Sequence, residues 1–211
     1  MLPLLKKLSG IIFPISCLLC DFPCDNQHAI CTHCNKTLPH YTINPNDNIF
    51  ALFHYETPIS ELIWKLKFHG DLSIAHLFST VWIDFIKQQH TFTLPDLIIP
   101  VPLHFSRLKQ RGFNQALEIA KPIGKYFHIP VDTKSCVRIK DTRPQSSLPA
   151  QKRKNNVKNA FGLSYSITAK HVAILDDVIT TGNTVSEITQ LLQKTGVETI
   201  DVWCCARATL H

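Results

Sequence analysis

The sequence predicts an α/β fold, in which a central and mostly parallel sheet is flanked by helices and preceded by a small cysteine-rich module. Two apolar runs, 97–102 and 172–175, each lead through a polar turn into a segment whose apolar residues have helical spacing. Two C-x-x-C motifs lie near the amino terminus. We therefore expect a metal-binding, zinc-ribbon-like module over residues 1–48 and an α/β domain over residues 49–211.

Length and composition fit a globular chain. Of its 211 residues, 45% are hydrophobic and 18% are charged, so it can bury a full core and form one large domain with a small appendage. The formal net charge is +6. An excess of this size suits partners such as nucleic acid or phosphorylated metabolites without selecting one of them.

The amino-terminal segment, MLPLLKKLSGIIFPISCLLC, imitates an export signal because lysines precede an apolar run. Pro14 interrupts that run, which is far shorter than the roughly 20 residues that span a membrane, and it shows no small-residue cleavage site. We expect an apolar helix, no transmembrane segment and a cytoplasmic protein. Peripheral contact with the inner face of the membrane, through Leu2, Leu4, Leu5 and residues 11–13, stays open.

Cys17 and Cys20 form one C-x-x-C motif, and Cys31 and Cys34 form a second. Four thiolates at about 2.3 Å from one ion match tetrahedral zinc. We prefer zinc to two disulfides because the rest of the chain has no extracellular cysteine pattern. Four protein ligands leave no open position for catalysis, so this zinc would be structural. Three nearby residues have open roles: Cys24, His28 and His33.

A polar linker, 44–48, separates this module from a strand expected over residues 49–55. Two helices should follow, one from Ile59 and one over residues 72–86. Lys65 is expected to be solvated. In this region, Lys67 is the candidate residue for facing an anion site.

The run 97–102 is interpreted as a strand, the next ten residues as a basic loop closed by Gly112, and the residues after it as an amphipathic helix that Pro122 should kink. Ligands of α/β sheets bind at the carboxyl ends of the strands. Arg107 and Arg111, with Lys109 between them, are therefore candidates for binding a pyrophosphate group. A solvated basic turn is the alternative.

The stretch 134–158 contains eight Lys or Arg residues and one acid, Asp141, and two prolines prevent a continuous helix. We expect a mobile basic loop. Such a loop can close over an active site and exclude water, grip a DNA backbone while aromatic side chains stack on bases, or be solvated. The sequence does not separate these three.

The segment VAILDDVITTGNT, 172–184, combines an apolar strand, an acidic pair and a small-residue turn before a helix that Gly196 should end. The turn lies at a helix N-terminus, where free N–H groups favour a phosphate. Asp176 and Asp177 would repel that phosphate unless they meet hydroxyls or a divalent cation. A ribose 5-phosphate fits. The turn residues are Thr180, Thr181, Gly182, Asn183 and Thr184.

This segment resembles the signature of type I phosphoribosyltransferases, which bind 5-phosphoribosyl 1-pyrophosphate (PRPP) with magnesium. The resemblance implies that Asp176 and Asp177 hold the ribose hydroxyls and that the turn wraps the 5-phosphate. Purine-salvage members carry a carboxylate where this chain has Thr180, so a purine-type general base is missing and no catalytic residue is assigned. The last expected strand, 200–205, is followed by Arg207 and shows no recognisable base-binding pocket.

Over nearly its whole length the chain resembles the ComF family of competence proteins and its gluconate-utilisation relative GntX. The cysteine pairs, VPLHFSRLKQRGFNQA and VRIKDTRPQSSLPAQKRKNNVKNAF carry the resemblance. It implies a zinc module on a type I phosphoribosyltransferase-like domain that assists uptake of single-stranded DNA, with a helicase as partner. The alternative is an active phosphoribosyltransferase that modifies a base or an amine. The candidate loop or DNA residues are Arg138, Arg143, Gln145, Arg153 and Asn156.

Overall fold

The computed structural model describes residues 15–24, 29–42, 47–89, 92–141 and 159–209, and every structural statement below concerns these residues. The expected amino-terminal helix, its membrane contact and His28 lie outside them. The elements, in chain order, are β1 (Ile15–Ser16), β2 (Pro23–Cys24), α2 (Thr32–Lys36), β3 (Ile49–His54), α3 (Ile59–His69), α4 (Leu72–Gln88), β4 (Leu97–Pro100), α5 (Phe105–Arg111), α6 (Gln115–Phe127), β5 (Cys136–Arg138), β6 (Phe161–Leu163), β7 (His171–Ile179), α8 (Asn183–Gln193) and β8 (Thr199–Arg207).

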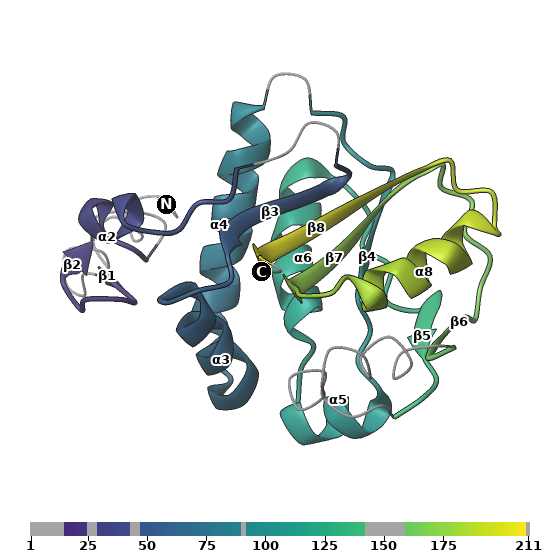
Figure 1. The fold of residues 1–211 in the computed structure, drawn as a ribbon, viewed down its shortest axis with the longest axis horizontal. Coiled ribbons are helices and arrows are strands. Elements are labelled where there is room, and N and C mark those ends of the chain that lie inside the picture. Colours follow the sequence, from purple (N-terminus) through teal and green to yellow (C-terminus); the bar gives the residue numbers. More distant parts are fainter. Residues whose placement is uncertain (1–14, 25–28, 43–46, 90–91, 142–158, 210–211) are drawn as a thin grey trace, which may run out of the picture.

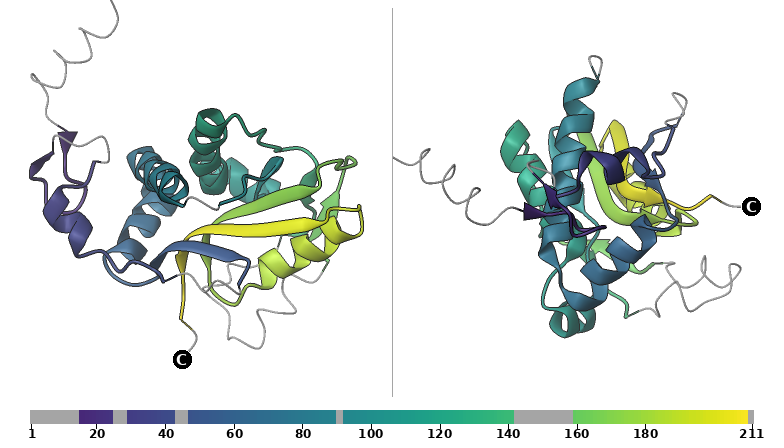
Figure 2. Two further views of the ribbon diagram at one scale, coloured as in Figure 1. Left: turned by 90° about the horizontal axis from the view of Figure 1, so that it is seen from above. Right: turned by 90° about the vertical axis from the view of Figure 1, so that its left-hand side faces the viewer.

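The central sheet has four strands in the order β3-β8-β7-β4, and all neighbouring strands in it are parallel. Helices cover both faces: α4 and α6 lie on one side of the sheet and α8 lies on the other (Figure 1, Figure 2). The predicted α/β class with a parallel sheet between helices is therefore confirmed. In such sheets the carboxyl ends of the strands meet at one edge, which is where ligands bind.

Alternate residues of β7 supply the two halves of the core. Ala173 and Leu175 join an apolar cluster with residues of α3, α4 and α6, whereas Val172 and Ile174 join a second cluster with residues of α8. This alternation follows from the two-residue period of a strand. It also determines on which face of the sheet each later side chain of β7 lies.

Strand β7 is longer than predicted, because it continues to Ile179 and contains the acidic pair. Its partner β8 explains the extension, since the register pairs Asp176 with Cys204 and Ile179 with Arg207. An acidic pair is unfavourable in a strand by propensity alone. Tertiary pairing overrides that preference here, so the carboxylates are held by a rigid element and not by a loop.

The basic segment after β4 was expected to be a loop, and this was wrong, because residues 105–111 form the helix α5. His104 caps its start by accepting a hydrogen bond from the Ser106 N–H at 3.3 Å. Gly112 ends it in the left-handed conformation, with φ 83°. Helix α6 is not interrupted at Pro122. The stretch expected as a mobile loop contains the strand β5 near its start, and β5 pairs with β6.

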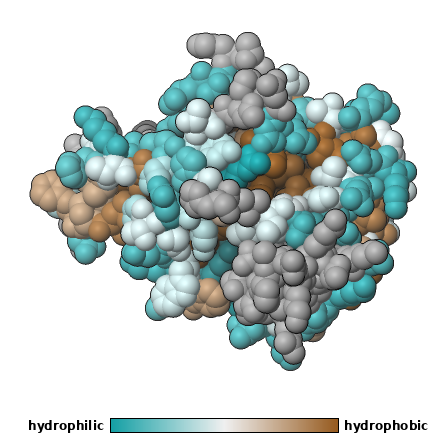
Figure 3. Space-filling view, in the orientation of Figure 1, coloured by the Kyte–Doolittle hydropathy of each residue, from teal (hydrophilic) through white to brown (hydrophobic). Residues whose placement is uncertain are grey.

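The cysteine-rich segment forms a small unit at one end of the molecule, where Figure 3 shows brown, apolar side chains. Strands β1 and β2 pair antiparallel. After α2 the chain reaches the free edge of the sheet, since the Tyr41 N–H donates to the Leu52 carbonyl at 2.9 Å and the His54 N–H donates to the Pro39 carbonyl at 2.8 Å. The module thus continues into the sheet, and its boundary at residue 48 stays a prediction.

Of the helices in the described part of the chain, none combines the length and the apolarity that crossing a bilayer requires.

Candidate functional site

The two acidic side chains of β7 leave the strand on opposite faces of the sheet. Asp177 follows Leu175 onto the side of α3 and α6, and Asp176 follows Ile174 onto the side of α8. The Oδ1 atom of Asp176 accepts the backbone N–H of Asp177 at 2.9 Å. The two carboxylates therefore do not face one common point, and each lies at a different part of the sheet edge.

Asp177 pairs with Lys67, which comes from the last turn of α3. The Lys67 Nζ lies 2.8 Å from the Asp177 Oδ2, and the side chains keep 24% and 4% of their exposure, respectively. Burial opposes the charge on Lys67, but the charge of Asp177, helped by that of Asp176, raises the pKa of Lys67 above its usual value. Lys67 is thus brought to the site, and its predicted role toward pyrophosphate stays a prediction.

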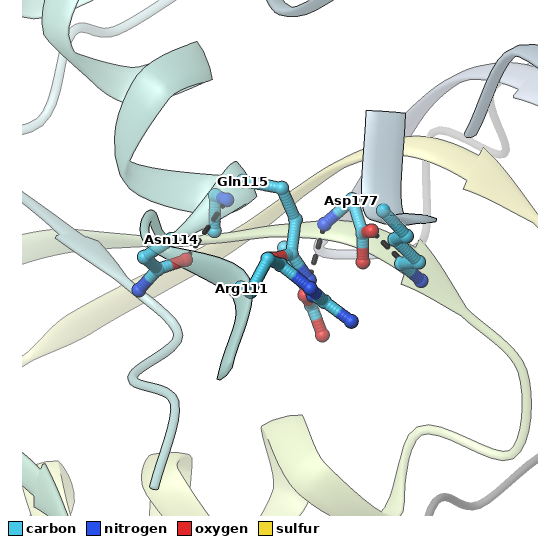
Figure 4. Close-up of polar contacts among 7 residues, drawn as sticks. Arg111, Asn114, Gln115 and Asp177 are labelled. Atoms are coloured by element: carbon cyan, nitrogen blue, oxygen red, sulfur yellow. Dashed lines mark hydrogen bonds and ion pairs between the residues drawn. The ribbon is translucent and has the colours of Figure 1, made fainter. Parts of the chain in front are cut away.

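Arg111 is held in place by Gln115 of α6. Its Nη1 donates to the Oε1 of Gln115 at 2.6 Å, and Gln115 is 5% exposed. Burial lowers the pKa of Arg111, although the charge of Asp177 acts in the opposite direction. In Figure 4, Arg111, Gln115 and Asp177 gather beside the end of the strand.

Asn114 fixes the start of α6 against β4. Its side-chain oxygen accepts the Ala116 N–H at 3.0 Å, which caps the helix (Figure 4), and its Nδ2 donates to the Val101 carbonyl at 3.0 Å. Asn114 and Gln115 lie near the end of VPLHFSRLKQRGFNQA, one of the segments that carry the family resemblance. Their role in the structure is to position the basic segment at the sheet edge.

Arg138 belongs to β5, and its guanidinium lies 5.4 Å from the ring centre of Phe161. Burial lowers the pKa of Arg138, the charge of Arg107 lowers it further, and the charge of Asp176 raises it. Arg107, Arg138 and Asp176 therefore lie close enough for the charges of Arg107 and Asp176 to change the pKa of Arg138. Arg138 was predicted for a loop, whereas it stands on a strand next to the site. The four other loop candidates lie outside the described residues: Arg143, Gln145, Arg153 and Asn156.

Asp176 has the most strongly shifted carboxyl group of the site. Burial, followed by the charge of Asp177, raises its pKa to about 8, while Lys67 acts against the shift. The shift favours the protonated form of this carboxyl group to a higher pH than is usual for an aspartate. A ligand that supplies a cation or hydroxyl groups would favour its ionised form.

The 180–184 turn forms a cup at the start of α8. Gly182 is the N-cap residue with φ 72°, so the first N–H groups of the helix point toward the cup without a capping side chain from the described chain. A cavity of about 20 Å³ lies here between Asp176 and Val185. The buried hydroxyl of Thr181, which lines the larger cavity next to this one, has no hydrogen-bond partner among the described residues. These features suit an anion with several oxygen atoms.

A larger cavity, of about 420 Å³, adjoins the same turn. It lies over the part of the sheet that α8 leaves uncovered, and Figure 3 shows an apolar hollow over β3 and β8. Arg207 lines it and donates to the Tyr41 hydroxyl at 3.0 Å and to Asp47. No sequence pattern indicates this cavity, because its walls come from separate segments: residues 41–42, 49, 54, 179–182 and 207–209.

Cys17, Cys20, Cys31 and Cys34 form the second candidate site. Their sulfur atoms all lie within 4.8 Å of one another, and Cys20 Sγ and Cys31 Sγ are 3.7 Å apart. Sulfur atoms at about 2.3 Å from a central ion would be about 3.8 Å apart in a regular tetrahedron. The four thiols can hold a metal ion such as zinc.

Two of the residues with open roles are now placed. Cys24 is not part of the four-sulfur cluster; its thiol donates to the Phe22 carbonyl at 3.5 Å, and burial raises its pKa to about 11. His33 is on α2 and is also outside the cluster. The cluster that could hold a metal ion therefore consists of the four cysteines of the two C-x-x-C motifs.

The structure thus combines an α/β fold, acidic and basic side chains gathered at the carboxyl edge of its sheet, and four clustered cysteines that could hold a metal ion. No protein-family model matches the chain. Individual related proteins do match the chain. DNA utilization protein YhgH of Shigella flexneri is 37% identical over 194 residues, covering 90% of this chain and 83% of the relative. Competence protein F of Haemophilus influenzae is 39% identical, covering 84% of each chain. Competence protein ComFC of Bacillus subtilis is 28% identical, covering 91% of this chain and 75% of the relative.

The chain belongs to the family of these relatives, the ComF family of competence proteins. Among solved structures, adenine phosphoribosyltransferase from Trypanosoma brucei, in complex with AMP, pyrophosphate and ribose-5-phosphate, is matched with a TM-score of 0.43 and 12% identity, over 81% of this chain and 87% of that chain. The adenine phosphoribosyltransferase from Leishmania tarentolae is matched with a TM-score of 0.40 and 14% identity, over 77% of each chain.

Proposed function

We propose that this protein binds PRPP with magnesium at the carboxyl edge of its sheet and assists the uptake of single-stranded DNA in natural transformation. One observation carries the PRPP proposal: the acidic pair of β7, the 180–184 turn and the basic side chains of α3, α5 and β5 converge on one edge. A ligand with a phosphate, a diol and a pyrophosphate needs these three kinds of group.

In our proposal, each part of the site binds a different group of PRPP. The 180–184 turn takes the 5-phosphate through backbone N–H groups and the Thr181 hydroxyl. Asp176, beside the turn, accepts hydrogen bonds from the ribose hydroxyls. Arg107 and Arg111, together with Lys67, take the pyrophosphate. Magnesium would be held by oxygen atoms of the ligand, and it would neutralise the pyrophosphate.

The DNA part of the proposal is supported by the relatives, which are named as DNA utilization and competence proteins, and by the net charge of +6. We place the protein in the cytoplasm, where imported single strands and a helicase partner meet it. The cysteine module carries zinc in this proposal and docks or stiffens the amino-terminal end.

Binding of fragments tests the PRPP proposal. Calorimetry should detect ribose 5-phosphate and pyrophosphate separately, and Arg107→Ala should weaken pyrophosphate binding while leaving ribose 5-phosphate binding unchanged. Oligothymidylate binding, measured in parallel over a salt series, tests the DNA proposal. A protein that binds neither PRPP nor its fragments lacks the proposed site, and one that ignores the oligonucleotide lacks the proposed DNA role.

The 420 Å³ cavity favours a second candidate function, an active phosphoribosyltransferase. It adjoins the turn at Thr180 and has aromatic and polar walls from Tyr41, His54 and Arg207, so a planar acceptor would lie next to the bound ribose. Thr180 offers no general base, which ranks this candidate second. Release of pyrophosphate from PRPP with a panel of bases and amines would establish it, and turnover that is lost in Asp176→Asn would exclude a role in binding alone.

A further inference from the structure

We propose that Trp64 and Phe68, on the outer face of α3, form a platform on which bases of single-stranded DNA stack; this rests on the DNA part of the proposed function and gives it a surface. The α3 platform, as we call this pair, is built from described residues and does not involve the basic 142–158 stretch. It stands on the same helix as Lys67, and Phe68 lies beside Arg111.

The two rings are exposed although they are large and apolar. Trp64 keeps 53% and Phe68 keeps 66% of its exposure. Their ring centres are 5.8 Å apart at an interplanar angle of 42°, as expected for side chains one helical turn apart. The other two tryptophans, Trp82 and Trp203, are fully buried and stack on each other, so Trp64 is the one of the three that is exposed.

Helix α3 does not need these rings for packing. Its inner face buries Ile59, Leu62, Ile63 and Leu66, which already cover the sheet and α4. Exposing Trp64 and Phe68 on the opposite face leaves two large apolar rings in contact with water, which has a solvation cost. This cost indicates a ligand that covers the rings.

A guanidinium and a histidine ring lie beside the two rings, and exposed lysines lie on the same helix and on α5. The guanidinium of Arg111 lies 5.8 Å from the ring centre of Phe68, and the His69 ring lies 4.7 Å from that of Trp64. Lys65 on α3 and Lys109 on α5 are exposed. Aromatic rings interleaved with cations match the bases and phosphates of a single strand. Protein interfaces also favour aromatic residues and arginine, but they are depleted in lysine.

The position of the platform links it to the PRPP site. Lys67 lies between Trp64 and Phe68 in sequence and turns inward to Asp177, 2.8 Å away, whereas the two rings point outward. One turn of α3, about 6 Å long, separates the rings and suits one or two stacked bases. A strand on the platform would have its phosphates near Lys65 and would pass close to Arg111.

Fluorescence and affinity together test the platform. Trp64 is the exposed residue of the three tryptophans, so oligothymidylate that stacks on it should quench emission, and Trp64→Phe should remove most of that quenching while keeping the affinity. Trp64→Ala should weaken binding about tenfold or more. It should leave the slope of affinity against salt concentration unchanged, because no phosphate contact is lost. PRPP affinity should stay the same, which shows an intact fold.

Tyr126→Ala is the matched control. Tyr126 is also an exposed helical aromatic residue, at 50%; a neighbouring ring, Phe127, lies at 4.9 Å and a cation, Lys87, at 5.9 Å. It lies at the far end of α6 from the site, so its loss should not change DNA binding. Equal oligonucleotide affinity of Trp64→Ala and the unsubstituted protein overturns the platform alone and assigns the rings to a protein partner. Failure of the unsubstituted protein to bind DNA overturns the platform and the DNA part of the proposed function, while PRPP binding stands separately.

Discussion

At the scale of single residues, the site contains a side chain that lowers the free energy of unfolding of the protein. Asp176 is held where burial and the charge of Asp177 raise its pKa to about 8. Asp177 is compensated by Lys67, but Asp176 is not compensated to the same degree. Strained electrostatics of this kind cluster at functional sites, which is why Asp176 is the most informative residue to change.

We predict that Asp176→Asn stabilises the protein at alkaline pH. Because the folded-state pKa of about 8 exceeds the usual 3.8, the unfolded state loses its proton first as pH rises. The Asp176 carboxyl group therefore lowers the free energy of unfolding progressively between about pH 4 and pH 8. The neutral amide should remove this loss and add about 1 kcal/mol or more at pH 8.5. At pH 4 the variant should differ little.

Chemical denaturation at both pH values measures this difference. A stabilisation that is the same at pH 4 and pH 8.5, or is absent at both, would show that the pKa of Asp176 is not raised.

Gln115 offers a second residue-scale prediction. Gln115→Leu keeps the size of a buried side chain but removes the oxygen that accepts from Arg111 at 2.6 Å. Arg111 should lose its fixed position, and PRPP affinity should fall about 3- to 10-fold, since a hydrogen bond to a charged group contributes about 1.5 kcal/mol or somewhat less when it acts indirectly. The same substitution at Gln110, which is exposed on α5, should leave affinity unchanged. Equal titration curves for the two variants would contradict this role.

At the scale of elements, the periodic segments were predictable and the polar ones were not. Helices α3 and α4 follow the apolar spacing from Ile59 and from Leu72, because burial of one face determines them. Helix α5 buries no residue, so no apolar pattern could indicate it; a histidine cap and a terminal glycine hold it. The acidic end of β7 was missed for a related reason, since pairing with β8 and not its own composition keeps it extended.

The 180–184 turn gives an element-scale prediction with a matched control. Gly182 and Gly196 have positive φ angles of 72° and 87°, and a Cβ on either would meet nothing within 4 Å. Alanine at either position should therefore cost about 1 kcal/mol of stability through backbone strain alone. Only Gly182→Ala should also weaken binding of ribose 5-phosphate, because only Gly182 shapes the start of α8.

Thermal denaturation and calorimetry of the two glycine variants separate the effects. Equal loss of ribose 5-phosphate binding in Gly196→Ala would mean that general destabilisation, and not the shape of the turn, controls the affinity.

At the scale of the whole molecule, the cysteine module and the α/β part share one apolar cluster, which includes Cys17, Ile30 and Leu38 beside residues of β3 and α4. The C-x-x-C spacing was enough to predict which thiols meet, because each pair forms a local knuckle. The 420 Å³ cavity was not predictable, since it arises where distant segments meet. A cluster formed by residues close in sequence could thus be predicted from the sequence, whereas a cavity formed between distant segments could not.

The metal site gives a whole-molecule prediction. Cys20→Ala should abolish zinc binding, measured by elemental analysis of the purified protein, and should lower the melting temperature because the module no longer closes. Cys24→Ala should keep one zinc per chain, since Cys24 lies outside the four-sulfur cluster. Full zinc content in Cys20→Ala, or its loss in Cys24→Ala, would contradict the assigned ligand set.

The most direct test of the central claim is a calorimetric titration of PRPP, with magnesium present, into the unsubstituted protein and into Asp176→Asn. The unsubstituted protein should bind one PRPP per chain, and Asp176→Asn should lose most of that affinity while being at least as stable, so that unfolding cannot explain the loss. Absence of binding to the unsubstituted protein, or equal affinity in the two proteins, would contradict a PRPP site at the carboxyl edge of the sheet.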